Sequence, residues 1–322
     1  MKPLFSILAL TLAGLTSPSH AANDFPQHPL ELIVPFAAGG GLDQNARSFA
    51  DALGKVLGQS VVVNNVAGAA GTIGMQRVAR TEADGHILAF TPAVPISSGP
   101  HRLTSVTYTA DDFDYVCQVF DNIFAIAVPA ASPYQNLGQL LEGARQSSGK
   151  LSYGTSGVGS IPHLGTANIE HQTGVSLNHV PYKGDGPMLQ DLLGDRLDFG
   201  AVLASSITGQ IQAGQLRLIA VYADKRHPAF PDVPTLGEAG VPVVQLSFGG
   251  VVAPRGLPPP VLAALEKACA DATQAPAYLE NARRANQVVD YISSKGFRER
   301  ILEDSRQQAD TLKRLGLDKQ AG

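Results

Sequence analysis

Hydrophobic residues in this chain alternate between short unbroken runs and longer stretches with helical spacing. The first run, Leu32-Ile33-Val34, ends at Pro35 and is followed by three glycines, Gly39 to Gly41. Apolar residues then recur every three or four positions as far as Leu57. This pattern predicts a buried strand, a glycine-rich turn and an amphipathic helix in succession.

The same alternation continues through most of the chain. Further strands are predicted at 60–63, 86–91, 115–119, 124–129, 151–153, 178–181, 197–202 and 216–221, and helices at 73–79, 137–145 and 207–213. Strands separated by helices favour right-handed crossovers and a largely parallel sheet. The pattern therefore predicts an α/β fold built from two units, each a mixed, mostly parallel sheet flanked by helices.

The last part of the chain is mostly helical, with helices predicted at 260–273, 276–285 and 297–315. Such a tail must bury its apolar face, and the first unit is the simplest place for it. We therefore expect a discontinuous first domain, residues 22–121 with 248–322, and a second domain of residues 122–247. The chain then crosses twice between the domains, as in hinged proteins that close around a ligand.

Three glycine-rich turns lead from a strand into a helix, within residues 36–41, 64–71 and 154–160. Glycine permits a positive φ and lets a ligand approach the main chain. A helix start offers unpaired N–H groups and the positive end of the dipole, which suits an anion. No Gly-Lys-Ser/Thr follows the first turn, and Gln44 replaces the last glycine of a G-x-G-x-x-G motif, so a nucleotide site is not expected.

The N-terminus has the pattern of a secretory signal peptide over residues 1–21. Lys2 precedes an apolar run from Leu4 to Leu15, and Ser19-His20-Ala21 is a small-x-small cleavage site. The run is shorter than the ~20 residues that a membrane span requires. We expect a soluble protein of the periplasm. The formal net charge of -4 gives no basic excess for binding nucleic acid.

Two cysteines matter in an oxidising compartment. Cys117 lies in a predicted strand and Cys269 in a predicted helix. Buried thiols in two core elements are the favoured interpretation, because a disulfide requires Cα atoms within about 7 Å. The sequence leaves a disulfide between them open.

An ordered series of motifs from Pro29 onward resembles the substrate-binding proteins of tripartite tricarboxylate transporters, also called Bug receptors. The series comprises Pro35-Phe36-Ala37-Ala38-Gly39-Gly40 with Asp43 and Arg47, Val63-Asn64-Asn65, Ala83-Asp84-Gly85, Gly154-Thr155-Ser156-Gly157-Val158-Gly159-Ser160, Val180-Pro181-Tyr182-Lys183-Gly184, Ala213-Gly214-Gln215-Leu216-Arg217 and Ala253-Pro254-Arg255-Gly256-Leu257-Pro258. Each motif alone is weak, but the ordered set is specific.

The resemblance implies a two-domain Venus-flytrap receptor without catalytic activity or cofactor. It implies a small organic carboxylate held between the domains by main-chain N–H groups, and delivery to the membrane subunits of such a transporter. We expect a monomer. The ligand-binding residues expected by this resemblance and by the turn pattern are Phe36, Ala37, Ala38, Gly39, Gly40, Ala67, Gly68, Ala69, Ala70, Gly71, Thr91, Thr155, Ser156, Gly157, Ser160, His163 and Val202.

One departure from the family pattern concerns the ligand. Many members carry an acidic residue at the end of the strand 197–202, where this chain has Val202. An acid there suits a ligand ammonium or hydroxyl group. Its absence favours a carboxylate less polar than an amino acid.

Other functions have weaker support in the sequence. Gly154-Thr155-Ser156-Gly157-Val158 approaches the G-x-S-x-G motif of α/β-hydrolases, but the last position is Val158, and none of His163, His171, His179 and His227 follows an obvious acid partner. His163 and His171 are not at i, i+4 spacing, so no metal site is predicted. A receptor that signals to a membrane sensor kinase, instead of serving transport, remains an alternative.

Overall fold

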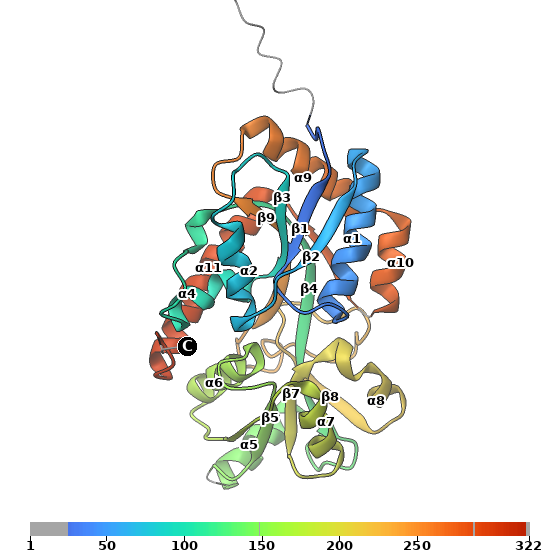
Figure 1. Ribbon diagram of the computed structural model, residues 1–322. Coiled ribbons are helices and arrows are strands. Elements are labelled where there is room, and N and C mark those ends of the chain that lie inside the picture. The colour runs from blue at the N-terminus through green and yellow to red at the C-terminus, as the bar shows by residue number, and fades with distance from the viewer. Residues whose placement is uncertain (1–24, 148, 286, 320–322) are drawn as a thin grey trace, which may run out of the picture.

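The computed structural model describes residues 25–147, 149–285 and 287–319 (Figure 1). The predicted signal peptide, residues 1–21, lies outside the described residues. The chain folds into two α/β lobes, one above the other in Figure 1, and a single long strand runs through both. Within the described residues, no helix combines the length and apolar character needed to cross a membrane.

The upper lobe is built on a mixed sheet. Its strands are β1 (Leu30–Val34), β2 (Val61–Asn65), β3 (Ile87–Pro92), β9 (Leu246–Pro254), the first part of β4 (Phe113–Pro129) and β10 (Val288–Ile292). The order is β2-β1-β3-β9-β4, with β10 also paired to β4. β1 is parallel to β2 and β3, whereas the pairs made by β9 and β10 are antiparallel.

The lower lobe has a smaller mixed sheet. It contains the last part of β4, β5 (Ser152–Thr155), β6 (Asn178–Pro181), β7 (Phe199–Leu203) and β8 (Leu216–Val221). β5 is parallel to β6 and β7, and β4 is antiparallel to β7 and β8. Both sheets are therefore mixed α/β sheets, as predicted. More of the strand pairs are antiparallel than expected, because β4 and β9 run antiparallel to their neighbours.

Helices flank the sheets and connect the strands. They are α1 (Gly41–Leu57), α2 (Thr72–Val78), α3 (Val94–Ser97), α4 (Gly99–Arg102), α5 (Leu137–Ser147), α6 (Ile161–Thr173), α7 (Asp185–Leu193), α8 (Thr208–Gln212), α9 (Pro259–Thr273), α10 (Pro276–Arg284) and α11 (Ser294–Arg314). Short 3-10 turns lie at η1 (Ala69–Gly71), η2 (Ala110–Asp112) and η3 (Ala204–Ile207). The sequence pattern does not predict the helices α3, α4 and α7 or the strands β9 and β10.

β4 corrects the prediction of two separate strands at 115–119 and 124–129. Asp121 and Asn122 interrupt the apolar run, yet the strand continues because Asp121 pairs with Phe248 of β9 and with Val288 of β10. The pairing partner changes from β9 at Ile123 to β7 at Phe124. This change lies close to the predicted boundary at residue 121, and we keep the two-domain boundaries as a proposal.

The hydrophobic cores follow the two lobes. Leu30, Phe49 and Phe120 share one upper cluster with Leu265 and Tyr278 of the helical tail. A second upper cluster contains Phe297 and Ile301 of α11. The lower clusters draw their buried residues from positions 123–243. The prediction that the tail buries its apolar face against the first unit is therefore confirmed.

A disulfide joins Cys117 of β4 to Cys269 of α9, with the Cα atoms 6.5 Å apart. The expectation of two buried free thiols is thus wrong. Sequence spacing could not reveal the pairing, because the residues are 152 positions apart and meet only when the tail packs on β4. Closing a loop of this length contributes roughly 5 kcal/mol in the chain-entropy model.

Candidate functional site

Residues 36–40, which we call the first ligand loop after their predicted role, connect β1 to α1. Ala37 through Gly40 are exposed, and Phe36 is half-buried. Gly39 has φ +84°, a conformation that favours glycine, whereas Gly40 is extended with φ -77°. Gly40 is the N-cap of α1 and supplies no side-chain cap, so the first amides of this 17-residue helix remain available to a ligand.

Asp43 holds the first loop in place from inside the first turn of α1. One carboxylate oxygen accepts hydrogen bonds from the Gly39 N–H at 2.9 Å and from Arg47 Nε at 3.1 Å. The other accepts from Asn65 Nδ2 at 2.9 Å, and the same amide donates to the Phe36 carbonyl at 3.1 Å. The hydrogen bond from Arg47, with those from Gly39 and Asn65, lowers the pKa of Asp43 to about 2.

The second ligand loop, residues 66–71, connects β2 to α2 and includes η1. Ala69 and Ala70 are exposed alanines with φ of 45° and 54°, in the left-handed region. This conformation costs on the order of 1 kcal/mol per residue and is typical of functional sites. Gly71 packs against the first loop, because a Cβ there would lie 3.1 Å from Phe36 Cε2 and 2.8 Å from Pro95 Cγ.

The third ligand loop, residues 156–160, connects β5 to α6 in the lower lobe. Ser160 is the N-cap of α6 by position, but its hydroxyl donates to the Gly157 carbonyl at 2.7 Å and does not cap the helix. Thr155 is buried, and its hydroxyl donates to the same carbonyl at 3.2 Å. The hydroxyls of Thr155 and Ser160 therefore hold the loop's shape.

Two stacked histidines contact the third loop and the end of β5. The ring centroids of His163 and His179 are 4.1 Å apart. His163 Nδ1 accepts the Gly159 N–H at 3.0 Å, and His179 Nε2 lies 2.7 Å from the Thr155 hydroxyl. Burial lowers the pKa of both rings, that of His179 to about 4 with a further contribution from His163. Both imidazoles are therefore neutral at pH 7.

Ser156 differs from the other hydroxyls of the third loop. It is half-buried, and within the described part of the chain its side chain makes no hydrogen bond. In particular, its hydroxyl has no histidine partner, since His179 contacts Thr155 and His163 contacts Gly159. A hydrolase would require such a partner. Ser156 is a hydroxyl donor available to a ligand.

Thr91 and Val202 lie in the interior. Both are 0% exposed. The Thr91 hydroxyl donates to the Pro92 carbonyl, and Val202 packs in the lower core with Ile123 and Ala204. Their positions at the ends of β3 and β7 match the sequence expectation, but their side chains do not line an accessible surface. Their side chains therefore have no exposed surface to offer a ligand.

Arg102, at the end of α4, links the loops of the two lobes and was not anticipated from the sequence. It lines a groove of about 720 Å³ together with Ala69 and Ala70 of the second loop. Its Nη1 lies 3.1 Å from where a Cβ of Gly159 would stand in the third loop. Among the described residues, none is an ion-pair or hydrogen-bond partner of its guanidinium. Nothing in the helical periodicity distinguishes this arginine from surface ones.

The lobes, the shared strand and the loops at the facing strand ends are the arrangement of a two-domain solute-binding protein. The model of the tripartite tricarboxylate transporter family receptor matches residues 45–317. The chain belongs to this family.

Relatives and solved structures agree with this assignment. The chain is 33% identical to the UPF0065 protein in gbd 5'region of Cupriavidus necator, over 97% of this chain and 94% of the relative. It is 32% identical to Protein BugT of Bordetella pertussis, over 87% of each. A TctC solute binding protein from Polaromonas, solved without ligand, has a TM-score of 0.83 at 30% identity and covers 90% of this chain and 99% of its own.

Two solved structures contain a carboxylate. An R. palustris protein with adipate has a TM-score of 0.76 at 29% identity, over 92% of this chain and all of its own. MatC from Rhodopseudomonas palustris, with bound malate, has a TM-score of 0.72 at 25% identity, over 89% of this chain and all of its own. In these two similar proteins, the bound small molecule is therefore a carboxylate.

Proposed function

We propose that this chain is a periplasmic receptor that closes its two domains around a small dicarboxylate and delivers it to the membrane subunits of a tripartite tricarboxylate transporter. The receptor acts as a monomer and performs no catalysis. The observation that carries the proposal is Arg102, a cation without a partner among the described residues, placed between the second and third loops.

The loops supply donors for one carboxylate. The first loop offers the uncapped start of α1, and the third loop offers the uncapped start of α6 with the Ser156 hydroxyl. Amides at a helix start attract anions through their N–H groups and through the dipole. α2 has only seven residues, so the second loop contributes through its left-handed alanines and not through a helix dipole.

Arg102 supplies the counter-ion for a second carboxylate. Within its groove, Arg77 is already paired with Glu31 at 2.8 Å, and Arg80 donates to the Thr107 hydroxyl. The guanidinium of Arg102 can therefore form a charge-assisted hydrogen bond at no cost to an existing ion pair. The adipate and malate in the two neighbours are both dicarboxylates, which supports this ligand class.

A ligand screen tests the proposal. Malate and adipate, their diamides and monocarboxylates of matched length are added in thermal-shift assays and in calorimetry. We expect stabilisation by the diacids, about 2.7 kcal/mol at a hundredfold excess over Kd. Stabilisation by diamides or sugars, with none by acids, would contradict the proposal.

The role of Arg102 has a matched control. Arg102→Ala should weaken a bound diacid by about 10- to 150-fold, the value of one hydrogen bond to a charged group, and should affect a monoacid less. Arg145→Ala removes an exposed arginine of α5 in the lower lobe, whose one ion-pair partner among the described residues is Glu142, and should change neither affinity. If Arg102→Ala lost the same affinity for the diacid as for the monoacid, Arg102 would not be the residue that binds the second carboxylate.

The alternative output, signalling to a membrane sensor kinase, uses the same ligand site. Measuring uptake of the diacid in cells that lack the receptor gene distinguishes transport from sensing. Lost uptake supports transport, and intact uptake with lost ligand-dependent gene expression supports sensing.

A further inference from the structure

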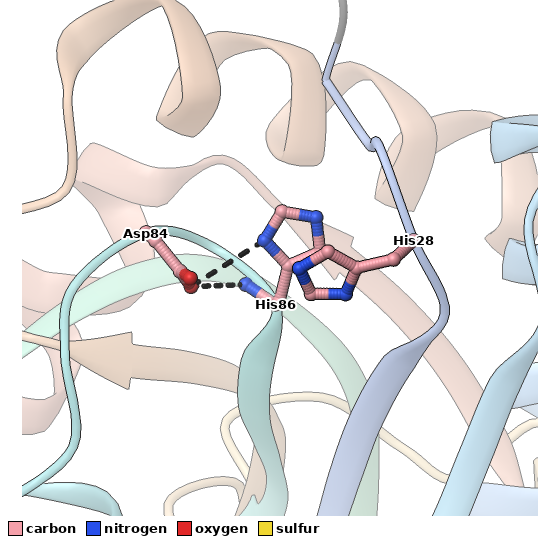
Figure 2. A group of neighbouring side chains, drawn as sticks. All are labelled: His28, Asp84 and His86. Atoms are coloured by element: carbon pink, nitrogen blue, oxygen red, sulfur yellow. Dashed lines mark hydrogen bonds and ion pairs between the residues drawn. The ribbon is translucent and has the colours of Figure 1, made fainter.

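His28, Asp84 and His86 form a cluster (Figure 2). It lies at the amino end of β1, whereas the first ligand loop follows the carboxyl end of the same strand. His28 precedes β1, and His86 directly precedes β3, the parallel neighbour of β1. The two histidines therefore lie at the amino ends of adjacent strands. One ligand atom from each of the three side chains lies within 4.8 Å of the others.

The ring of His86 is enclosed without hydrogen-bond partners. His28 stacks on it with the ring centroids 3.7 Å apart, and Phe25 contacts it edge-on at 5.2 Å. Both ring nitrogens of His86 are buried, and neither makes a hydrogen bond. Buried polar atoms are nearly always satisfied, so two such atoms on one ring indicate a missing partner such as an ion or water.

Asp84 is already oriented toward this ring. Its Oδ1 accepts the backbone N–H of His86 at 2.8 Å and lies 3.5 Å from His86 Nδ1. Two ligand atoms on a tetrahedral Zn²⁺ with bonds of 2.0–2.1 Å are separated by about 3.3 Å. The Asp84 oxygen and the His86 nitrogen therefore already have nearly the separation that two ligands of one metal ion require.

We propose that His28, Asp84 and His86 form a binding site for a divalent transition metal, with Zn²⁺ as the reference ion. Two imidazoles and a carboxylate suit Zn²⁺, Ni²⁺ or Cu²⁺ and not Mg²⁺ or Ca²⁺. Three protein ligands leave a coordination position for water.

Binding requires one movement. The His28 and His86 rings are only 22° from parallel, so their in-plane nitrogen lone pairs do not converge on one point. His28 is exposed and lies in the segment before β1, so its side chain can turn toward the ion without disturbing the sheet. Asp84 and His86 stay in place.

The test is a titration of tag-free protein with ZnCl2 in the presence of a competing zinc indicator. A polyhistidine tag is omitted because it binds the same metals. We expect one equivalent bound, and no comparable binding of Mg²⁺ or Ca²⁺. Co²⁺ in place of Zn²⁺ should give a visible d–d absorption that reports the ligand geometry.

Substitutions at His28 and Asp84 test whether these residues bind the Zn²⁺. His28→Ala and Asp84→Asn should each lose more than about tenfold in Zn²⁺ affinity, the least that an altered metal site usually costs. Asp84→Asn keeps the acceptor for the His86 N–H, so the turn before β3 should stay intact. His171→Ala removes an exposed histidine of α6 and should bind Zn²⁺ as the unmodified protein does.

Two results would overturn the proposal. One is no stoichiometric Zn²⁺ binding by folded protein. The other is binding that His28→Ala and Asp84→Asn leave unchanged. The cluster lies away from the ligand loops, so carboxylate affinity should be the same with and without Zn²⁺.

Discussion

The first and third ligand loops both end in a glycine with positive φ followed by an extended N-cap residue, but they are held by different chemistry. In the upper lobe, the ionised carboxylate of Asp43 collects hydrogen bonds from Gly39, Arg47 and Asn65. In the lower lobe, neutral hydroxyls and imidazoles hold the loop, through Ser160 and His163. A glycine-rich loop at the start of a helix can therefore be held in place by a charged side chain or by neutral ones. The two loops should therefore respond differently to mutation and to pH.

The largest effect is expected from removing the charge beneath the first loop. Asp43→Asn keeps the side chain's size but loses the ion pair with Arg47 and one acceptor position. We expect the free energy of unfolding to fall by about 1.5–3 kcal/mol, the value of a hydrogen bond to a charged group. Carboxylate affinity should fall as well, because Gly39 is no longer fixed. Urea unfolding followed by circular dichroism, together with calorimetry, measures both.

Asp51→Asn is the matched control on the same helix. Asp51 forms an exposed i, i+4 pair with Lys55, and such pairs contribute about 0.3–0.5 kcal/mol. If Asp43→Asn were no more destabilising than Asp51→Asn, the charged network would not be what holds the first loop.

A smaller effect should separate the loops by pH. Because the pKa of His179 is lowered from 6.5 to about 4, its neutral form stabilises the fold fully above pH 6.5, and this contribution is lost as the pH falls toward 4. The pKa of Asp43, lowered to about 2 from 3.8, makes its contribution full above about pH 4 and lost below that. Between pH 7 and pH 5, the third loop should therefore weaken, whereas the first loop should not.

His179→Gln tests this difference, since glutamine does not titrate. The loss of unfolding free energy between pH 7 and pH 5 should be smaller in His179→Gln than in the unmodified protein. His171→Gln, at an exposed position of α6, should retain the full loss. An unaltered pH dependence in His179→Gln would assign the titration to other groups.

The sequence predicted the α/β fold and most elements because periodic apolar patterns carry that information. α1 and α9 through α11 match the expected helices within three residues at either end. The sequence pattern divides β4 into two strands because Asp121 and Asn122 are polar, although Asp121 has a long-range partner in Arg300 at 2.9 Å. The disulfide depends in the same way on a contact between distant parts of the chain.

The sequence predicts which loops form the candidate site, but it does not predict which side chains in those loops are available to a ligand. Glycine-rich turns between a strand and a helix indicate where amides are exposed, and the three loops lie where expected. Which hydroxyl is free depends on hydrogen bonds inside a loop, so Ser156 and Ser160 are not distinguishable from sequence. Arg102 comes from a four-residue helix with no motif, and only the packing of the two lobes brings it near Gly159.

The central claim is that one carboxylate ligand is held by loops from both lobes. The direct test is calorimetry of Ser156→Ala with the diacid that stabilises the unmodified protein, with Ser176→Ala, an exposed serine outside the third loop, as control. We predict a loss of about 10- to 150-fold in affinity for Ser156→Ala, because one hydroxyl donor to a charged group is removed, and no change for Ser176→Ala. Unchanged affinity in folded Ser156→Ala would contradict the account, because the lower lobe would then not bind the ligand through this loop's hydroxyl.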